Sequence, residues 1–402
     1  MRGKEIRLIY LVPSKGISYD QKGGAGTHIR GTINALKNKG IIVTPVIHGS
    51  LHVNKDFHAN NTSPNYAVYQ NLKSKLPKQL TLFLQDIRII FDDLVFFSKA
   101  YKLIKKNKSK IIYERSCFLS ISGLILSKLF NQYYYVETSG ALVEIFINDY
   151  GTTLRPLANL VEKLKLKFAD CIVTESNASI DFVRKKYELK DKQIISKPLG
   201  ITSLQANAYD IPTIKKLKLK LNISPEDFVL GYVGTFASYH NVDFLISTFK
   251  MINNPHIKLI LVGAGGSFTH IQKRVEEENI KNVIFTGYIP NAEVSNYFAL
   301  MQVGVIPNCE EHLMPIKTYE YGLHFICPLV PGYYGSMEIE KYNAGILFKA
   351  LNSTSLNEQI LYLFNNRELV ERYGKAWNKI VLENYLWDTT IQALVDNIIQ
   401  NN

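Results

Sequence analysis

The feature that most constrains this sequence is its alternation between short β-branched or aromatic runs and longer segments of helical periodicity. Such alternation is typical of βα units and predicts a parallel sheet covered by helices. The pattern occurs twice, on either side of an irregular, lysine-rich stretch at 201–225. Because 402 residues exceed one ordinary compact domain, the sequence predicts an α/β protein with two domains.

The predicted elements follow directly from this periodicity. Strand-like runs of the first series occupy 6–12, 41–48, 110–114, 133–138, 171–175 and 193–197. Those of the second series occupy 228–233, 258–262, 283–286, 303–306 and 325–329. Helical periodicity marks 27–38, 87–106, 120–130, 156–169 and 178–187, then 242–251, 268–279, 292–301 and 318–323. Residues 49–69 favour a mobile loop, and 357–366 with 368–400 predict a closing pair of helices.

The net charge of +12 favours anionic partners, which include nucleic acids, anionic lipid surfaces and phosphorylated substrates. The lysine clusters are either solvated helix faces or docking sites for an anionic membrane. No RNA-binding or helix-turn-helix pattern favours nucleic acid. Neither a membrane-spanning run nor a zinc or disulfide cysteine pattern is found. We therefore expect a cytoplasmic protein, with peripheral contact at the inner face of the membrane as an open alternative.

The first predicted strand leads into a glycine-rich turn, Gly23-Gly-Ala-Gly-Thr-His28, and then into a helix. Glycines let the backbone approach a ligand closely, and a helix start presents unpaired N–H groups to an anion. The turn lacks the third glycine of the dinucleotide-binding fingerprint. An ordinary tight βα turn therefore remains the alternative.

The second series carries three strand-end features of its own. Glycine-rich turns at 231–236 and 261–266 follow two strands, and Lys317 and Glu320 follow a third. Lys317 and Glu320 are three residues apart, so they are neighbours on one face of a helix start. A lysine suits a diphosphate, and a carboxylate can accept hydrogen bonds from ribose hydroxyls. The alternative is a common surface ion pair, but the shared sheet edge favours a binding crevice.

Eight segments together resemble the retaining GT-B glycosyltransferases of family four (glycosyl transferases group 1). That family includes sucrose synthases and bacterial capsule and lipopolysaccharide transferases, and the resemblance covers nearly the whole chain. The segments, in order, are 23–28, 135–140 with Glu144, 169–176, 198–201, 231–243, 261–265, 285–290 and 315–321.

The resemblance implies two facing Rossmann-like domains with a C-terminal helix pair that closes back. The domains would be an acceptor domain (1–200), a linker (201–225), a donor domain (226–385) and a final helix (386–402) packing toward the first domain. The implied donor-binding residues are Gly24, Ala25, Gly26, Gly234, Thr235, His240, Gly263, Tyr288, Ile289, Pro315, Lys317 and Glu320. Within this set, Lys317 would contact the diphosphate, Glu320 the ribose, and Tyr288 with Ile289 the base.

The sequence departs from the family pattern at two places. His312 stands where many members carry the first of two glutamates, the second matching Glu320. His240 and Asn241 stand where a cationic residue and a glycine are usual. These changes resemble a subgroup with a tryptophan-histidine-glycine version of the loop, and they bear on the donor contacts.

The expected catalytic residues are Glu137, His28 and Lys317. Breaking a sugar–phosphate bond leaves negative charge on the diphosphate, which Lys317, His240 and the glycine-turn N–H groups can stabilise. Glu137 ends a strand at the carboxyl edge, where it could contact the reacting sugar or the acceptor. For His28 a purely packed role is the alternative. No Asp-x-Asp pattern suggests a bridging metal, so we expect no metal and no cofactor besides the nucleotide diphosphate sugar, a co-substrate.

The sequence therefore predicts a glycosyltransferase that moves a sugar from a nucleotide diphosphate sugar to a saccharide or lipid-linked acceptor. The resemblance implies retention of configuration and a place in bacterial cell-surface polysaccharide synthesis. One alternative is a sugar-nucleotide epimerase of the same fold, which needs no acceptor. Another is a non-catalytic basic protein that binds nucleic acid or a membrane.

Overall fold

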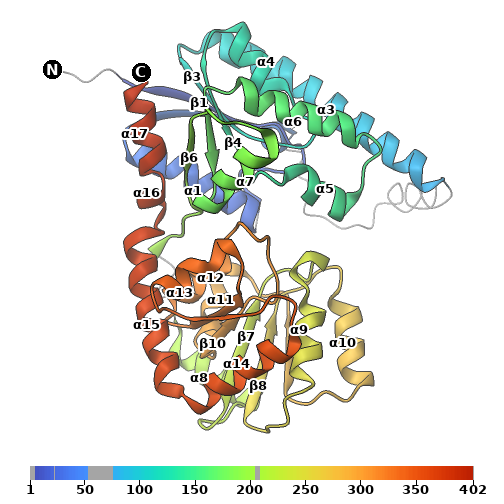
Figure 1. Ribbon diagram of the computed structural model, residues 1–402, viewed down its shortest axis with the longest axis vertical. Helices are drawn as coiled ribbons and strands as arrows, with labels where there is room; N and C mark the ends of the chain where they lie inside the picture. The colour runs from blue at the N-terminus through green and yellow to red at the C-terminus, as the bar shows by residue number, and fades with distance from the viewer. Residues whose placement is uncertain (1–4, 22, 53–75, 204–208, 402) are drawn as a thin grey trace. The chain divides into compact units, whose positions relative to one another are not determined.

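The computed structural model describes residues 5–21, 23–52, 76–203 and 209–401, and it divides into two compact units (Figure 1). Unit 1 comprises Met1–Pro198 and Ile391–Asn402, and unit 2 comprises Leu199–Thr390. Each unit contains a six-stranded sheet in which the paired strands are parallel. The α/β fold with two Rossmann-like domains is confirmed.

The sheet of unit 1 has the strand order β2-β1-β3-β4-β5-β6. Its strands are β1 (Arg7–Val12), β2 (Ile42–Ile47), β3 (Ile111–Arg115), β4 (Tyr133–Glu137), β5 (Cys171–Thr174) and β6 (Ile194–Ser196). Since β2 and β3 flank β1 on opposite sides, the winding of the chain reverses between β1 and β3. In open α/β sheets, ligands bind at the carboxyl ends of the strands at such a switch point.

Helices and one short 3-10 turn accompany this sheet. They are α1 (Gly24–Asn38), η1 (Gly49–His52), α3 (Lys78–Lys106), α4 (Ser122–Leu129), α5 (Leu142–Tyr150), α6 (Arg155–Phe168), α7 (Asn177–Tyr187) and α17 (Gln392–Gln400). The late helix α17 packs beside β6, and the Tyr135 hydroxyl donates to Asn397 Oδ1 over 2.8 Å. The last helix of the chain is thus part of the N-terminal unit.

The sheet of unit 2 has the order β12-β11-β10-β7-β8-β9, with its switch point between β7 and β10. The strands are β7 (Phe228–Val233), β8 (Ile257–Val262), β9 (Val283–Gly287), β10 (Val303–Val305), β11 (Cys327–Pro331) and β12 (Ile346–Phe348). The helices are α8 (Ile211–Lys220), α9 (Val242–Phe249), α10 (Phe268–Glu277), α11 (Asn291–Phe298), α12 (Ile316–Leu323), α13 (Met337–Lys341), α14 (Ser353–Asn365), α15 (Arg367–Asn384) and α16 (Trp387–Thr390), with 3-10 turns η4 (Ser238–His240) and η5 (Tyr334–Ser336).

The structure corrects two sequence expectations, and a third lies mostly outside the described residues. The stretch 201–225 is not an irregular linker throughout, because 211–220 forms α8, whose Ile214 and Leu217 pack on the core of unit 2. The stretch 368–400 is not one helix but is divided into α15, α16 and α17. Between α15 and α16 the backbone of 385–387 pairs with Ile201, which accepts a hydrogen bond from Trp387 N and donates one to Tyr385 O. Of the expected loop at 49–69, only 49–52 lies within the described residues.

Close packing of α15 fixes the position of α12. The Trp377 indole donates to the Thr318 carbonyl over 2.7 Å, and Asn378 Nδ2 donates to the Gly322 carbonyl over 2.9 Å. A Cβ atom added at Gly374 would lie 2.0 Å from the Phe325 carbonyl oxygen. Only glycine therefore lets α15 approach the end of α12 so closely.

We expect Gly374→Ala to lower the free energy of unfolding by about 1–3 kcal/mol, because the added methyl group must push the two segments apart. Gly266→Ala is the matched control, since a Cβ there meets nothing within 4 Å. Denaturant titration of both variants checks this expectation. Equal stability of the two would show that the α12–α15 contact is not tight.

Candidate functional site

Three polar side chains meet at the carboxyl edge of the unit 1 sheet. Glu137 ends β4, His28 lies in α1, and Lys197 directly follows β6. Glu137 Oε1 lies 2.9 Å from His28 Nε2 and 2.8 Å from Lys197 Nζ. All three side chains are buried. The structure thus brings the predicted residues Glu137 and His28 together and adds Lys197, which the sequence analysis did not single out.

The charges of this cluster follow from its surroundings. Burial alone would raise the pKa of Glu137, but His28, Lys197 and Arg115 hold that pKa well below its ordinary value. Burial lowers the pKa of His28 to about 4, and Arg115 and Lys197 contribute in the same direction. The cluster therefore contains a carboxylate and a neutral imidazole, whose Nε2–H donates to Glu137.

Part of this cluster has unused hydrogen-bonding capacity. Among the described residues, Glu137 Oε2 and the hydroxyls of Tyr10 and Tyr113 are buried without a hydrogen bond of good geometry, and the Tyr113 hydroxyl interacts with Glu137. Tyr10 on β1 packs against Tyr113 on β3, with ring centroids 5.2 Å apart. A buried carboxylate oxygen without a hydrogen bond is costly, and a hydrogen bond from the Tyr113 hydroxyl or from a bound hydroxyl group would offset that cost.

The glycine-rich turn of unit 1 lies where β1 leads into α1. Gly23 has a φ of 101°, and a Cβ at Gly26 would lie 2.0 Å from the Gln21 carbonyl oxygen, so both positions require glycine. Gly24 is exposed, and the first turn of α1 has neither an acidic residue nor a side-chain cap. Arg115 Nη1 donates to the Ala25 carbonyl over 3.3 Å. A cation beside an uncapped helix start suits an anionic ligand.

A second group of predicted residues meets at the switch point of unit 2. Lys317 and Glu320 lie in α12, which follows Pro315, with Lys317 Nζ 2.6 Å from Glu320 Oε2. Burial, followed by the charge of Lys317, lowers the pKa of His240 to about 4. Asn308 Nδ2 donates to the Tyr239 carbonyl over 2.9 Å and so connects the segment after β10 to the segment after β7.

The glycine turns of unit 2 pack against each other. Gly263 has a φ of 134°, and a Cβ there would lie 1.9 Å from the Gly234 carbonyl oxygen. Thr235, next to Gly234, is exposed. Tyr288 follows β9 and is 62% exposed, whereas Ile289 is half-buried against the core of unit 2. Tyr288 thus presents its ring to solvent, while the Ile289 side chain contributes to packing.

Some polar residues at these edges were missed by the sequence analysis. Arg115, Glu175 and Lys197 each end or directly follow a strand of unit 1. Their shared place at the carboxyl ends of β3, β5 and β6 is the signal that could have found them. Within 5–21, 23–52, 76–203 and 209–401, no group of three His, Cys, Asp or Glu side chains is arranged to hold a metal ion.

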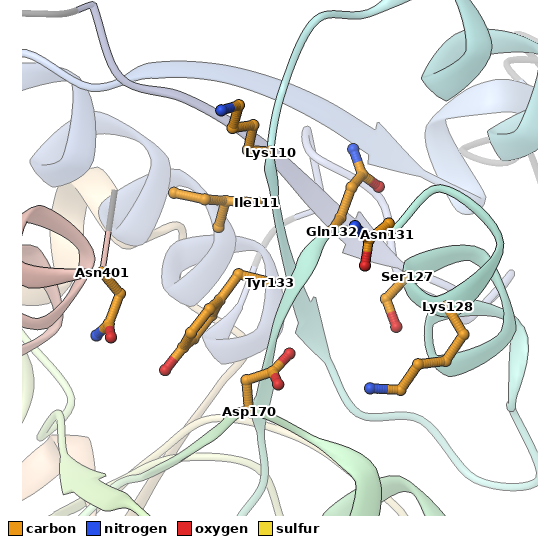
Figure 2. A pocket seen from close by; sticks show the side chains of 9 residues that line it. All are labelled: Lys110, Ile111, Ser127, Lys128, Asn131, Gln132, Tyr133, Asp170 and Asn401. Atoms are coloured by element: carbon orange, nitrogen blue, oxygen red, sulfur yellow. The ribbon is translucent and has the colours of Figure 1, made fainter.

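A hollow of about 360 Å³ lies elsewhere in unit 1 (Figure 2). It is found where β3 and β4 begin, at the amino edge of the sheet. The lining residues are Lys110, Ile111, Ser127, Lys128, Asn131, Gln132, Tyr133, Asp170 and Asn401. No predicted site residue lines it, so we do not assign the site to this hollow.

Comparison with known proteins agrees with the geometry. Residues 213–379, which include α12, match the family model "Glycosyl transferases group 1". The O-antigen chain mannosyltransferase C of Escherichia coli is 23% identical over 247 residues, which span 60% of this chain and 64% of that protein.

Two solved structures share the fold over nearly the whole chain. Sucrose-phosphate synthase from Thermosynechococcus elongatus has a TM-score of 0.74 at 16% identity, over 99% of both chains. The Anabaena protein HepE in complex with UDP has a TM-score of 0.68 at 14% identity, over 99% of this chain and 100% of that chain. The fold is that of the GT-B class, and together with the family match it supports a glycosyltransferase.

The buried His28 predicts a pH dependence of stability. The unfolded chain binds a proton at His28 near the ordinary pKa of 6.5, whereas the folded chain binds it only near about 4. Because the unfolded state then holds more protons, stability should fall as the pH drops from 6.5 towards 4.

The measurement is denaturant-induced unfolding across that pH window. We expect His28→Asn to remove on the order of 3 kcal/mol of this pH-dependent loss, since one pKa unit corresponds to about 1.4 kcal/mol. The exposed His270, replaced by Asn, serves as the control. Identical pH profiles for wild type and His28→Asn would contradict the assignment of a neutral, buried His28.

Proposed function

We propose that this chain is a retaining, metal-independent glycosyltransferase that uses a nucleotide diphosphate sugar. The acceptor would be a saccharide or a lipid-linked saccharide, in the synthesis of a bacterial cell-surface polysaccharide or lipopolysaccharide. The match to the glycosyl transferases group 1 model and the similarity to an O-antigen mannosyltransferase support the reaction class. The UDP complex of HepE, which shares the fold, supports a nucleotide donor.

The observation that carries this proposal is the Lys317–Glu320 pair at the start of α12. Its position at the β7–β10 switch point is where a doubly wound sheet binds a nucleotide. In our proposal Lys317 and the neutral His240 stabilise the diphosphate, and Glu320 accepts hydrogen bonds from the ribose hydroxyls. Gly234, Thr235, Gly263 and Pro315 shape the crevice around them.

Sugar transfer breaks the bond between the anomeric carbon and the diphosphate oxygen and forms one to the acceptor oxygen. The nucleoside diphosphate leaves with the bonding electron pair, and the proton of the acceptor hydroxyl passes to the departing diphosphate or to water. In our proposal, Lys317 stabilises the charge that develops on this leaving group.

In unit 1, we propose that the buried carboxylate of Glu137 accepts a hydrogen bond from a sugar hydroxyl at Oε2, in place of its interaction with Tyr113. His28, neutral at ordinary pH, would orient that carboxylate. The turn of Gly24, Ala25 and Gly26, of which Gly24 is exposed and Gly26 is buried, would offer N–H groups to an anionic group.

The expectation of no metal and no cofactor rests on the sequence, in which no Asp-x-Asp pattern suggests a metal bridge. We also propose a cytoplasmic location, because all four cysteines are free and reducing compartments keep thiols unpaired. No helix in the described part of the chain is long and apolar enough to cross a membrane.

The alternatives can be separated by their products. A sugar-nucleotide epimerase would convert the donor without an acceptor, whereas a transferase releases nucleoside diphosphate only with an acceptor or, slowly, with water. A non-catalytic basic protein would do neither. A screen of nucleotide sugars for thermal stabilisation identifies the donor first.

We expect Lys317→Ala and Glu320→Ala each to weaken nucleotide-sugar binding at least tenfold, about 1.4 kcal/mol, because each removes one contact with the diphosphate or the ribose. Isothermal titration calorimetry with the donor found in the screen measures this change. Lys375→Ala is the matched control, since Lys375 forms an exposed ion pair with Glu371 in α15. Unchanged affinity in both site variants would reject the donor site.

A further inference from the structure

Helix α3 (Lys78–Lys106) combines buried carboxylates with a row of exposed apolar side chains. Two of its carboxylates, Asp86 and Asp93, are buried. Six of its large exposed apolar side chains, which we call the α3 stripe, are Leu80, Phe83, Leu84, Ile87, Phe91 and Leu94, whereas the exposed Leu103 lies outside this row. A helix on a soluble domain normally buries its apolar residues and exposes its carboxylates.

The α3 stripe lies on one face of the helix. Its members recur at spacings of three, four and seven residues, which place them on the same side of an α-helix. Phe91 and Leu94, near the middle of the helix, are 62% and 60% exposed. Contiguous apolar surface of this kind marks an interaction site.

The buried carboxylates fix the direction in which the stripe points. Asp86 accepts hydrogen bonds from the Thr152 hydroxyl and from the amide and hydroxyl of Thr153, over 2.8–3.0 Å. Asp93 accepts from the Ser120 hydroxyl over 2.6 Å and from the amides of Ile121 and Ser122 at the start of α4. Rotating α3 to bury Phe91 would break these bonds and leave two carboxylates unpaired.

Other residues of α3 pack against neighbouring helices and the core of unit 1, so the helix is firmly attached although the stripe is exposed. Ile89 and Ile90 pack in a cluster with residues of α5 and α6, and Phe96 is fully buried in the core of unit 1. These helices lie beside α3 in the ribbon diagram (Figure 1).

Positive charge continues the stripe towards the end of the helix. Lys102 and Lys105 lie on the same face, one and two turns after Ser98, and both are exposed. No Asp or Glu occurs between Asp93 and Glu114, whereas this stretch holds the lysines Lys99, Lys102, Lys105, Lys106, Lys108 and Lys110. The face therefore combines large apolar side chains with the positive charges of Lys102 and Lys105.

We propose that the α3 stripe docks unit 1 on an anionic phospholipid membrane, with α3 lying in the plane of the headgroups. The stripe would enter the boundary between headgroups and acyl chains, and Lys102 and Lys105 would contact lipid phosphates. A second copy of this chain would suit the stripe less well, because parallel pairing would bring the same lysines together and antiparallel pairing would place Lys102 and Lys105 against the apolar start of the partner's stripe. This inference goes beyond sugar transfer and does not depend on the donor site.

The experiment is sedimentation of the full chain with vesicles of phosphatidylglycerol and phosphatidylcholine, compared with phosphatidylcholine alone. We expect binding to the anionic vesicles that weakens as salt is raised. The variant Phe83→Ser/Phe91→Ser/Leu94→Ser should bind at least tenfold less. The matched control replaces exposed apolar residues of unit 2, Met251→Ser/Tyr362→Ser/Leu382→Ser, and should bind like wild type.

Two further measurements keep the test decisive. Lys102→Glu/Lys105→Glu should lose the preference for phosphatidylglycerol, and all variants should keep wild-type circular dichroism and donor affinity. Equal loss of binding in the stripe and control variants, or no binding of wild type to anionic vesicles, would overturn the proposal. A concentration-dependent dimer that the stripe variant abolishes, without vesicle binding, would instead assign the stripe to a second copy.

Discussion

The reversal of winding within each parallel sheet is the constraint on which the rest of this structure depends. The chain starts each sheet in the interior, at β1 or β7, and then builds outward in both directions. The connections on the two sides of that strand diverge, which leaves a gap at the carboxyl ends of β1 and β3 and of β7 and β10. His28 in α1 and Glu137 at the end of β4 lie near the first of these positions, and Lys317 and Glu320 in α12, which follows β10, lie near the second.

Burial makes the polar cluster of unit 1 both costly and informative. Placing Glu137 and Lys197 away from water carries a desolvation penalty that their mutual attraction only partly offsets. A well-packed apolar group of similar volume would serve stability equally well. The buried charged pair and the neutral His28 therefore mark a candidate functional site.

Much of this architecture could be predicted from the sequence, because apolar strands and glycine turns leave strong local signals. The Lys317–Glu320 pair was predictable since its two members are close in the chain, whereas Lys197 and His28 meet only through the fold. The start of α3 was missed because periodicity analysis assumes that apolar residues are buried and carboxylates exposed. In this part of α3 two aspartates are buried and several large apolar residues are exposed. Helix α8 was missed because its many lysines obscure the helical spacing of the few apolar side chains that pack on the core of unit 2.

Unit 1 is discontinuous in the chain, since it closes with 391–402 after the whole of unit 2. During synthesis on the ribosome, the hydrogen bond between the Tyr135 hydroxyl and Asn397 cannot form until Asn397 emerges, which is after the entire second unit has been made. Unit 2, continuous from Leu199 to Thr390, has no such delay. Vectorial synthesis therefore favours completion of the second half first, and the first half reaches its final state post-translationally.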